Sequence, residues 1–325
     1  MTNLLEIKNL SVEYRTAGVW VSAVHNLSLA LQDGEVFALV GESGCGKSTT
    51  AFAMSNLLDR SSARVSGEVH YRGASVLGLK PDDMAELRGR EIGMIFQNPL
   101  DSLNPVYQVG VQVQEALLLD QMSPQQAWER TLASFKEVRI PDSESRLKNY
   151  PHELSGGMRQ RVMISMMICR KPRLLIADEP TTALDVTIEA QILDIIRQLK
   201  QKYGTTILLI THNFGTVAEL ADRVGVMYGG TLVEIGNVYD LFKHPSHPYT
   251  QMLLRALPTI RKHEGRLQVI EGTVPRFTAD FQGCRFQQRC PLVQEICLKS
   301  TPQLEQVGAD HQAACHMIKQ KDEAV

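Results

Sequence analysis

The stretch from Val36 to Thr49 reads Val-Phe-Ala-Leu-Val-Gly-Glu-Ser-Gly-Cys-Gly-Lys-Ser-Thr. Its first part, Val36–Val40, is a short apolar run without polar alternation, which is typical of a strand buried on both faces. The second part, Gly41–Thr49, fits the pattern G-x-x-x-x-G-K-[ST], and a helical pattern follows over Thr49–Leu58. A strand, a glycine-rich loop and a helix in this order predict a phosphate-binding loop (P-loop) in an α/β fold.

Small residues in such a loop let successive backbone N–H groups turn toward a β-phosphate, and the following helix adds its positive end. We expect Lys47 to reach the β- and γ-phosphates of ATP and the Ser48 hydroxyl to bind Mg²⁺. A glycine-rich turn with a chance lysine is disfavoured, because every fixed position of the pattern matches in the right context. The residues expected to bind ATP here are Gly41, Ser43, Gly44, Cys45, Gly46, Lys47, Ser48 and Thr49.

Further apolar runs predict other strands of the same kind of sheet. These runs are Ile92–Phe96, Leu174–Asp178, Ile207–Thr211 and Val224–Tyr228. Between the last three lie helical patterns. In 188–203, apolar residues recur at i, i+4, i+7 and i+8, and Gly204 is placed to end the helix. The alternation of strands and helices predicts an α/β core.

The predicted strand Leu174–Asp178 ends in two carboxylates, Asp178 and Glu179. The carboxyl ends of strands in α/β folds border the crevice where ligands bind. Asp178 suits Mg²⁺, and Glu179, which points differently, is able to polarise an attacking water. The pair alone is a weak signal, since a helix cap would explain it equally well, but a P-loop in the same chain favours the functional interpretation.

Other parts of the chain follow different patterns. The first thirty or so residues and Val65–Tyr71 alternate as antiparallel strands do. The segment 105–171 is mostly helical and separates two core strands, so we interpret it as an insertion. After Gly236 the pattern weakens. We therefore predict a nucleotide-binding domain over 1–236 and a small cysteine-containing C-terminal domain over 237–325.

Composition agrees with a globular protein. The 325 residues are 43% hydrophobic and 22% charged, with a formal net charge of −2. A pI near 6.5 gives no electrostatic argument for nucleic acid as a partner. No apolar run approaches the roughly 20 residues that cross a bilayer, and Glu6 lies where a signal peptide needs an apolar stretch. We expect a cytoplasmic chain that meets a membrane only through partners.

The stretch Leu154–Arg161, Leu-Ser-Gly-Gly-Met-Arg-Gln-Arg, lies just before the strand that ends in Asp178. With it, the chain resembles the nucleotide-binding subunit of an ABC transporter, whose signature is LSGGxxQR. The resemblance implies a head-to-tail dimer in which each ATP lies between one subunit's P-loop and the other's signature. The Ser155 hydroxyl and the N–H groups of Gly156 and Gly157 would then form a second phosphate site at a helix N-terminus.

The resemblance assigns further residues one by one. Gln97 matches the Q-loop glutamine, which contacts Mg²⁺ and the attacking water, and His212 matches the switch histidine near the γ-phosphate. Ala183-Leu184-Asp185 matches the D-loop, which faces the other subunit. Tyr14 fits the aromatic residue that stacks on adenine, although Trp20 is close and also aromatic. The implied Mg²⁺ ligands are Ser48, Gln97 and Asp178.

Three stretches look like the oligopeptide/dipeptide/nickel importer branch: Asn98–Pro105, His247–Pro258 and Gly283–Pro291. One departure is Cys45, where the family's loop commonly has Ser. The branch implies two transmembrane permease subunits, an extracytoplasmic substrate-binding protein and a second ATPase subunit, with a heterodimer favoured over a homodimer. It also implies a peripheral position on the cytoplasmic face of the membrane. The sequence of this subunit does not identify the cargo, which is a dipeptide, a longer oligopeptide, nickel or a metal chelate.

Four of the six cysteines crowd near the end of the chain, with the spacing C-x₅-C-x₆-C-x₁₇-C. Compact zinc sites usually show paired C-x₂₋₄-C knuckles, which this spacing does not have. Iron–sulfur clusters tolerate varied spacings, and some members of the importer branch carry a 4Fe–4S cluster on such cysteines. We favour 4Fe–4S over zinc, with four reduced thiols as the alternative. These residues are Cys284, Cys290, Cys297 and Cys315.

The sequence therefore predicts an ATP-hydrolysing subunit that powers uptake through separate membrane subunits. A soluble ABC ATPase acting on ribosomes or nucleic acid is the main alternative. Such proteins often carry two cassettes or a long coiled-coil insert, and this sequence shows one cassette and no heptad insert. The presence of Glu179 and His212 disfavours a module that only binds ATP. An exporter ATPase is a further alternative, but such ATPases are often fused to membrane helices, and this sequence shows none.

Overall fold

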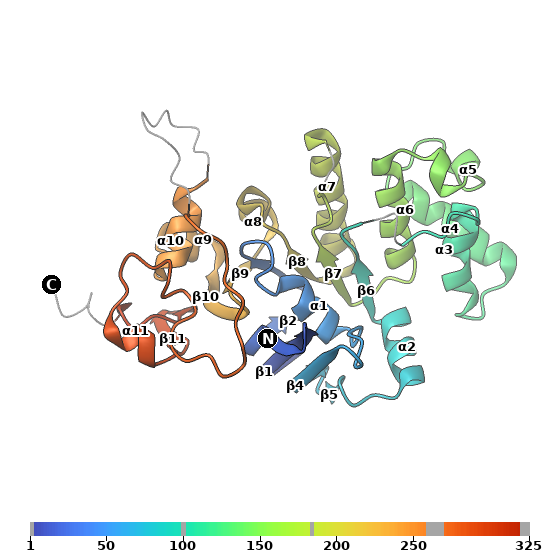
Figure 1. Cartoon of the computed structure of the whole chain (residues 1–325). Coiled ribbons are helices and arrows are strands. Elements are labelled where there is room, and N and C mark those ends of the chain that lie inside the picture. Colours follow the sequence, from blue (N-terminus) through green and yellow to red (C-terminus); the bar gives the residue numbers. More distant parts are fainter. Residues whose placement is uncertain (1–2, 99–101, 183–184, 258–269, 319–325) are drawn as a thin grey trace. The chain divides into compact units, whose positions relative to one another are not determined.

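The computed structural model describes residues 3–98, 102–182, 185–257 and 270–318. The chain divides into two compact units. The first unit comprises Met1–Gln32, Val36–Gly78 and Ile210–Val325, and the second comprises Asp33–Glu35 and Leu79–Leu209. Each contributes part of an α/β architecture (Figure 1).

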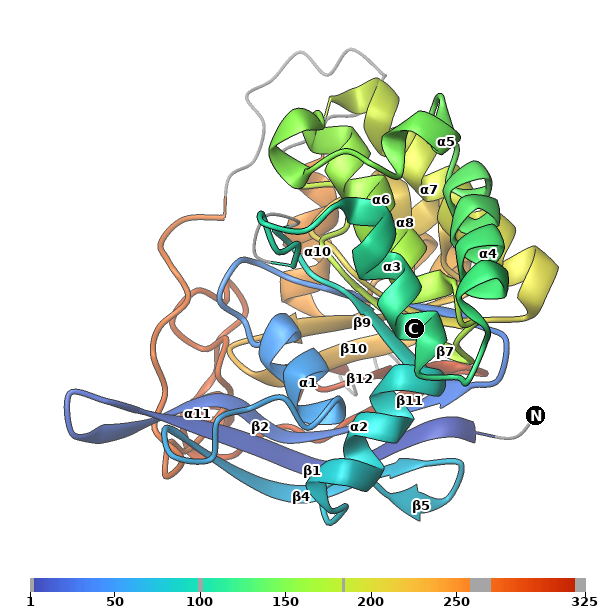
Figure 2. The ribbon, with the colours of Figure 1, turned by 90° about the vertical axis from the view of Figure 1, so that its right-hand side faces the viewer.

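The first unit contains an antiparallel sheet with the strand order β2-β1-β4-β5. Its long strands lie side by side in Figure 2. Four apolar residues of β1 are at most 1% exposed: Leu5, Ile7, Leu10 and Val12. A register shift between Ile7 and Leu10 interrupts the alternation, and Asn9 there has a positive φ of 49°. The sheet confirms the antiparallel prediction, and its strands are β1 (Asn3–Thr16), β2 (Val19–Gln32), β4 (Ala63–Tyr71) and β5 (Ala74–Ser75).

A second group of strands in the first unit carries the P-loop. Strand β3 (Val36–Val40) is buried along its whole length and pairs in parallel with β9 (Arg223–Tyr228). Strand β10 (Thr231–Asn237) pairs antiparallel with β9, and β12 (His311–Ala313) pairs with the other edge of β10. Strand β11 (Glu305–Gly308) pairs antiparallel with β12. The end of the chain therefore extends the strand group that begins at the P-loop.

The helices of the first unit are short. They are α1 (Lys47–Met54), α8 (Phe214–Leu220), α9 (Val238–Lys243), α10 (Pro248–Arg255) and α11 (Glu295–Lys299). The helix predicted to continue to residue 58 ends at Met54, because Ser55 caps it and Asn56 takes a left-handed conformation with φ 48°.

A buried carboxylate attaches the C-terminal tail, described over residues 270–318, to strand β10. Glu234 is 0% exposed and accepts hydrogen bonds from the backbone N–H groups of Ser246 at 2.6 Å and His247 at 3.0 Å. Its other contact is with His311 Nε2 at 2.7 Å. A buried carboxylate is stable only when it is hydrogen-bonded in this way. The proposed domain boundary at 236/237 falls inside β10 and stays a prediction.

The second unit holds three strands in the order β8-β7-β6, with β6 and β7 parallel. Its predicted helical insertion is present and gathers α3 to α6, drawn in green in Figure 1. The longest helix, α7, ends at Gly204, which has φ 63°, as the sequence predicts. The elements are α2 (Pro81–Arg90), β6 (Ile92–Ile95), α3 (Val109–Leu118), α4 (Pro124–Glu137), α5 (Ser143–Arg146), the 3₁₀ turn η1 (Pro151–Glu153), α6 (Gly156–Ile168), β7 (Leu174–Asp178), α7 (Val186–Tyr203) and β8 (Thr206–Ile210).

Over the residues that the structure describes, no helix combines the length and the apolar character needed to cross a membrane.

Because His247 is buried, we predict that the folded protein loses stability at acid pH. It caps α10, where its Nδ1 accepts the Tyr249 N–H at 3.0 Å, and it is 1% exposed. Burial lowers the pKa of His247 to about 4, although the Glu234 charge opposes this. The unfolded chain takes up a proton near pH 6.5 and the folded chain does not, so stability falls as pH drops from about 6.5 toward 4.

We expect His247→Asn, which keeps a capping side chain, to remove up to about 3 kcal/mol of this acid loss. Melting temperature against pH measures the effect. The exposed His244 provides the control, His244→Asn. An acid slope that is unchanged in His247→Asn would contradict the assignment.

Candidate active site

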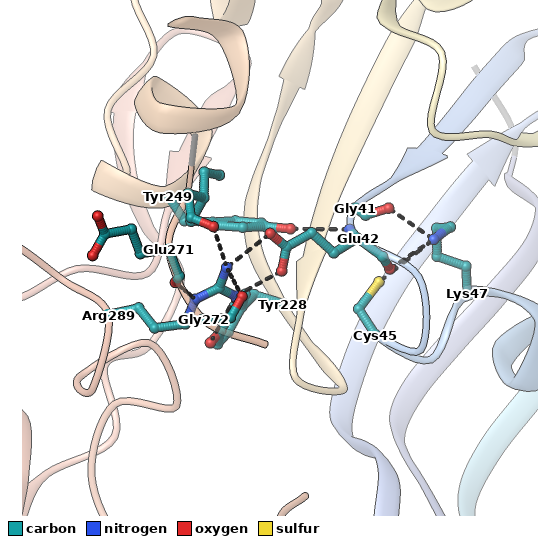
Figure 3. A network of polar contacts seen from close by, with 10 residues as sticks. Gly41, Glu42, Cys45, Lys47, Tyr228, Tyr249, Glu271, Gly272 and Arg289 are labelled. Atoms are coloured by element: carbon teal, nitrogen blue, oxygen red, sulfur yellow. Dashed lines mark hydrogen bonds and ion pairs between the residues drawn. The ribbon is translucent and has the colours of Figure 1, made fainter. Parts of the chain in front are cut away.

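The P-loop lies in the first unit, where its backbone passes very close to neighbouring strands (Figure 3). Gly41 has φ 151°, and a Cβ there would lie 2.2 Å from the Met227 carbonyl oxygen. Gly46 has φ 104°, and its Cβ would lie 2.4 Å from the carbonyl oxygen of Ala23. Only glycine fits at either position, so the loop has the geometry that the motif predicts.

Lys47 is folded back on its own loop. Its ammonium donates to the carbonyl oxygens of Gly41 at 2.8 Å and Glu42 at 3.0 Å, and the residue is 5% exposed. Helix α1 begins at Lys47, and its N-cap is Gly46, which offers no side chain to the first N–H groups. Such N–H groups and a lysine together suit a phosphate ligand.

The other residues of the loop differ in their exposure to solvent. Ser43 and Gly44 are exposed at the tip of the loop, and Ser48 and Thr49 are half-buried in the first turn of α1. Cys45 is 0% exposed, and burial raises the pKa of its thiol, although the nearby Lys47 charge opposes the rise. The thiol is therefore protonated at neutral pH, and the substitution of Cys for Ser does not add a charge to the loop.

In the second unit, the two carboxylates lie at the end of β7. Asp178 is 3% exposed. Glu179 adopts a left-handed conformation with φ 46°, which is strained for a residue with a Cβ and is common at functional sites. Its carboxylate accepts hydrogen bonds from Gln97 Nε2 at 2.9 Å and Thr182 Oγ1 at 2.8 Å. The structure thus brings Gln97 and Glu179 together, and it adds Thr182, which no sequence motif indicates.

The signature residues open helix α6. Ser155 is its N-cap, and the Ser155 hydroxyl accepts the Met158 N–H at 3.3 Å. Ser155, Gly156, Gly157 and Asp185 line one cavity of about 610 Å³ in the second unit. The guanidinium-bearing residues Arg139 and Arg161 line the same cavity. A helix N-terminus beside two arginines is an environment that favours a phosphate.

Packing positions this signature. Gly157 faces α7, where a Cβ would lie 2.9 Å from Ile188 Cγ2. Gln160 is 2% exposed and donates to the Pro180 carbonyl at 2.7 Å, directly after Glu179. Helix α6 is therefore tied to the segment that carries the two carboxylates.

The remaining predicted residues are spread over both units. His212, in the first unit, is exposed between β8 and α8. Tyr14 is half-buried on β1, beside Val21 on the neighbouring strand β2. The guanidinium carbon of Arg64 lies 3.8 Å above the ring of Trp20, which covers one face of the rival aromatic residue. Asp185 is exposed at the N-terminus of α7, and the other two D-loop residues, Ala183 and Leu184, lie outside the described residues.

The four tail cysteines lie near one another in the first unit. Burial first, and then the nearby Cys297, Cys290 and Cys315, raise the pKa of the Cys284 thiol to about 12. The Cys284 N–H donates to the Cys297 carbonyl at 2.7 Å. Within the described part of the chain, no group of three or more His, Cys, Asp or Glu side chains stands in a metal-binding arrangement.

Comparisons with known proteins follow the same motifs. The family model described as "ABC transporter" matches residues 24–182, and "Oligopeptide/dipeptide transporter, C-terminal region" matches residues 233–297. The chain is 44% identical over 313 residues to the oligopeptide transport ATP-binding protein OppD of Escherichia coli, covering 96% of this chain and 92% of OppD. The chain belongs to the ABC transporter ATP-binding proteins.

Two further similarities agree. The dipeptide transport ATP-binding protein DppD of Haemophilus influenzae is 45% identical over 315 residues, which cover 96% of this chain and 95% of DppD. A solved dimer of the ATP-binding cassette MJ0796, bound to ADP and Pi, superimposes with a TM-score of 0.66 at 25% identity. It covers 72% of this chain and 98% of the cassette. This ABC ATPase therefore has the α/β cassette fold that the sequence predicts, and ATP with Mg²⁺ suits it.

One group of contacts at the P-loop was not predicted from the sequence. Glu42, inside the P-loop, binds Tyr249 of α10 and Arg289 of the tail. Both residues lie in stretches already notable for their resemblance to importer ATPases, but nothing in the sequence pairs them with the P-loop.

Glu179→Gln is expected to abolish turnover while nucleotide binding persists. The amide keeps the size of the side chain but removes the carboxylate that we expect to orient or activate water. We expect hydrolysis to fall about 100-fold or more, with nucleotide affinity changed little. Phosphate release and equilibrium nucleotide binding measure the two quantities. The control is Glu129→Gln, on the exposed face of α4. Rapid hydrolysis by Glu179→Gln would contradict the role assigned to Glu179.

Proposed function

We propose that this ABC ATPase powers the import of di- or oligopeptides, or of nickel or metal chelates, through separate membrane subunits. Support comes from relatives named for oligopeptide and dipeptide transport at 44% and 45% identity over nearly the whole chain. The match of residues 233–297 to an oligopeptide/dipeptide transporter region adds to it.

The observation that carries the mechanism is the signature cavity. Ser155 and Gly156 are exposed there, beside Arg139 and Arg161. We infer that this cavity receives the γ-phosphate of an ATP held by a second ATPase subunit. ATP would then bridge two subunits, and its hydrolysis would replace attractive contacts with repulsion between ADP and phosphate.

Each catalytic residue has a proposed role. Ser48, Gln97 and Asp178 would hold Mg²⁺, which would neutralise phosphate charge, and Lys47 would stabilise charge on the transferring phosphoryl group. Glu179 orients or activates the attacking water. His212 contacts the γ-phosphate, Asp185 faces the second subunit and Tyr14 stacks on adenine. These last three roles, and that of Gln97, rest on the family resemblance.

The proposed partners are two permease subunits, a second and different ATPase subunit and an extracytoplasmic substrate-binding protein. Exposed apolar side chains follow the Gln97 segment: Val106 is 69% exposed, Tyr107 56% and Leu119 70%. Isolated exposed apolar residues are ordinary, but a group on the helical insertion fits a permease helix docking there. The subunit would then lie at the cytoplasmic face of the membrane.

Purification of Glu179→Gln with ATP from its native cells tests this proposal. ATP should trap the closed complex, so after membrane solubilisation we expect two multi-span membrane proteins and a related ATPase to co-purify. Wild-type protein without ATP is the control. Ribosomal proteins or nucleic acid in place of membrane subunits would assign the chain to the soluble ABC ATPases instead.

We also propose that the four tail cysteines hold a 4Fe–4S cluster, ahead of zinc. The donor set suits either metal centre, because thiolates are ligands for zinc and for iron–sulfur clusters. Cys284 and Cys290 also lie near enough to the other tail cysteines to interact with them electrostatically. The thiols would have to approach further and lose their protons, and a bound cluster would then cross-link the tail.

Anaerobic purification tests the cysteine centre. We expect iron and sulfide in equal amounts, with visible absorption, and a loss of most of both in Cys290→Ser. Cys169→Ser, which changes a buried cysteine outside the tail, is the matched control. Zinc without iron would favour the zinc alternative, and the absence of any metal would favour reduced thiols.

A further inference from the structure

Glu42 is held from three directions by residues of the first unit (Figure 3). Its backbone N–H donates to the Tyr249 hydroxyl at 3.0 Å. Its carbonyl accepts from Lys47 at 3.0 Å. Its carboxylate accepts two hydrogen bonds from Arg289, Nη1 to Oε2 at 2.7 Å and Nη2 to Oε1 at 3.0 Å. Two of the three anchors come from the C-terminal region.

The Arg289 guanidinium is itself tightly placed. Its side chain is 7% exposed, and its Nε donates to the Glu271 carbonyl at 2.9 Å. It also lies 5.6 Å from the centre of the Tyr228 ring, which packs edge-on against Tyr249. The pKa of Arg289 is held above its ordinary value, chiefly by the hydrogen bonds to Glu42. A two-pronged pair of this kind fixes direction as well as distance.

Without Arg289, the negative charge of Glu42 would oppose nucleotide binding. The P-loop must accept a triphosphate that carries several negative charges, and a carboxylate in the same loop repels it. Arg289 cancels that charge. It also draws the carboxylate toward the tail, and the Glu42 carbonyl is one of the acceptors that hold Lys47.

We propose that Arg289 is a positioning residue for nucleotide binding: it holds Glu42, sets the P-loop conformation and neutralises the loop's carboxylate. The inference rests on the P-loop binding ATP, and neither peptide import nor a metal on the cysteines is needed for it. Arg289 does not touch the reacting atoms in this role.

A double-mutant cycle tests the proposal, with binding of Mg²⁺-ATP measured for wild type, Arg289→Ala, Glu42→Gln and the double variant. We expect Arg289→Ala to weaken affinity about tenfold, which corresponds to about 1.4 kcal/mol. The double variant should recover most of that loss, because no carboxylate is left unpaired. KM should rise more than kcat falls.

Salt and a conservative variant separate this role from a merely structural one. The Arg289→Ala defect should shrink at high ionic strength, because salt screens the repulsion between Glu42 and the nucleotide. Arg289→Lys, which keeps the charge, should restore part of the affinity. If Arg289→Ala does not fold, Arg289→Gln replaces it in the cycle. Arg276→Ala, an exposed tail arginine, is the control and should bind like wild type.

Two results would overturn the proposal. One is wild-type affinity in a folded Arg289→Ala protein. The other is a double variant as weak as Arg289→Ala, which would mean that the loss comes from disruption of the tail and not from the exposed charge on Glu42.

Discussion

The P-loop depends on backbone contacts that leave no space for a Cβ atom. At Gly41 the neighbour is the carbonyl of Met227 on β9, and at Gly46 it is the carbonyl of Ala23 on β2. Two strands from distant parts of the sequence therefore set the path of the loop. Strand β9 also pairs with β3 and β10. The strand pairing of the first unit therefore also determines the shape of its phosphate site.

Buried polar groups attach the C-terminal region to those strands. Glu234 on β10 is 0% exposed and holds the start of α10, and Arg285 is 4% exposed and donates to the Ser22 hydroxyl on β2 at 3.1 Å. Burial lowers the pKa of Arg285 to about 10, so it stays charged at neutral pH. Removing one partner of such a contact leaves a buried charge or polar group unsatisfied, which is costly. The region is therefore joined by directional contacts as well as by apolar packing.

The sequence predicts local features well and distant ones poorly. The run Val36–Val40, the glycines that follow it and the end of α7 at Gly204 each depend on neighbouring residues, and the structure confirms them. The sequence motifs identify Glu179, Gln97 and the signature residues one by one. The structure shows that Glu179 contacts Gln97 and that the signature residues line one cavity. The pairing of Arg289 with Glu42 was not predicted, because residue spacing carries no information about partners separated by so much chain. The addition of β11 and β12 beside β10 escaped prediction for the same reason.

The separation between Glu42 and Arg289 also has a consequence during synthesis. The two residues are 247 positions apart. A ribosome that adds about 5–20 residues per second needs on the order of ten to fifty seconds to cover that distance. During that time the P-loop has already been made, and its carboxylate has no guanidinium to pair with. A nascent chain that has not yet reached Arg289 therefore carries its P-loop without the ion pair that holds Glu42.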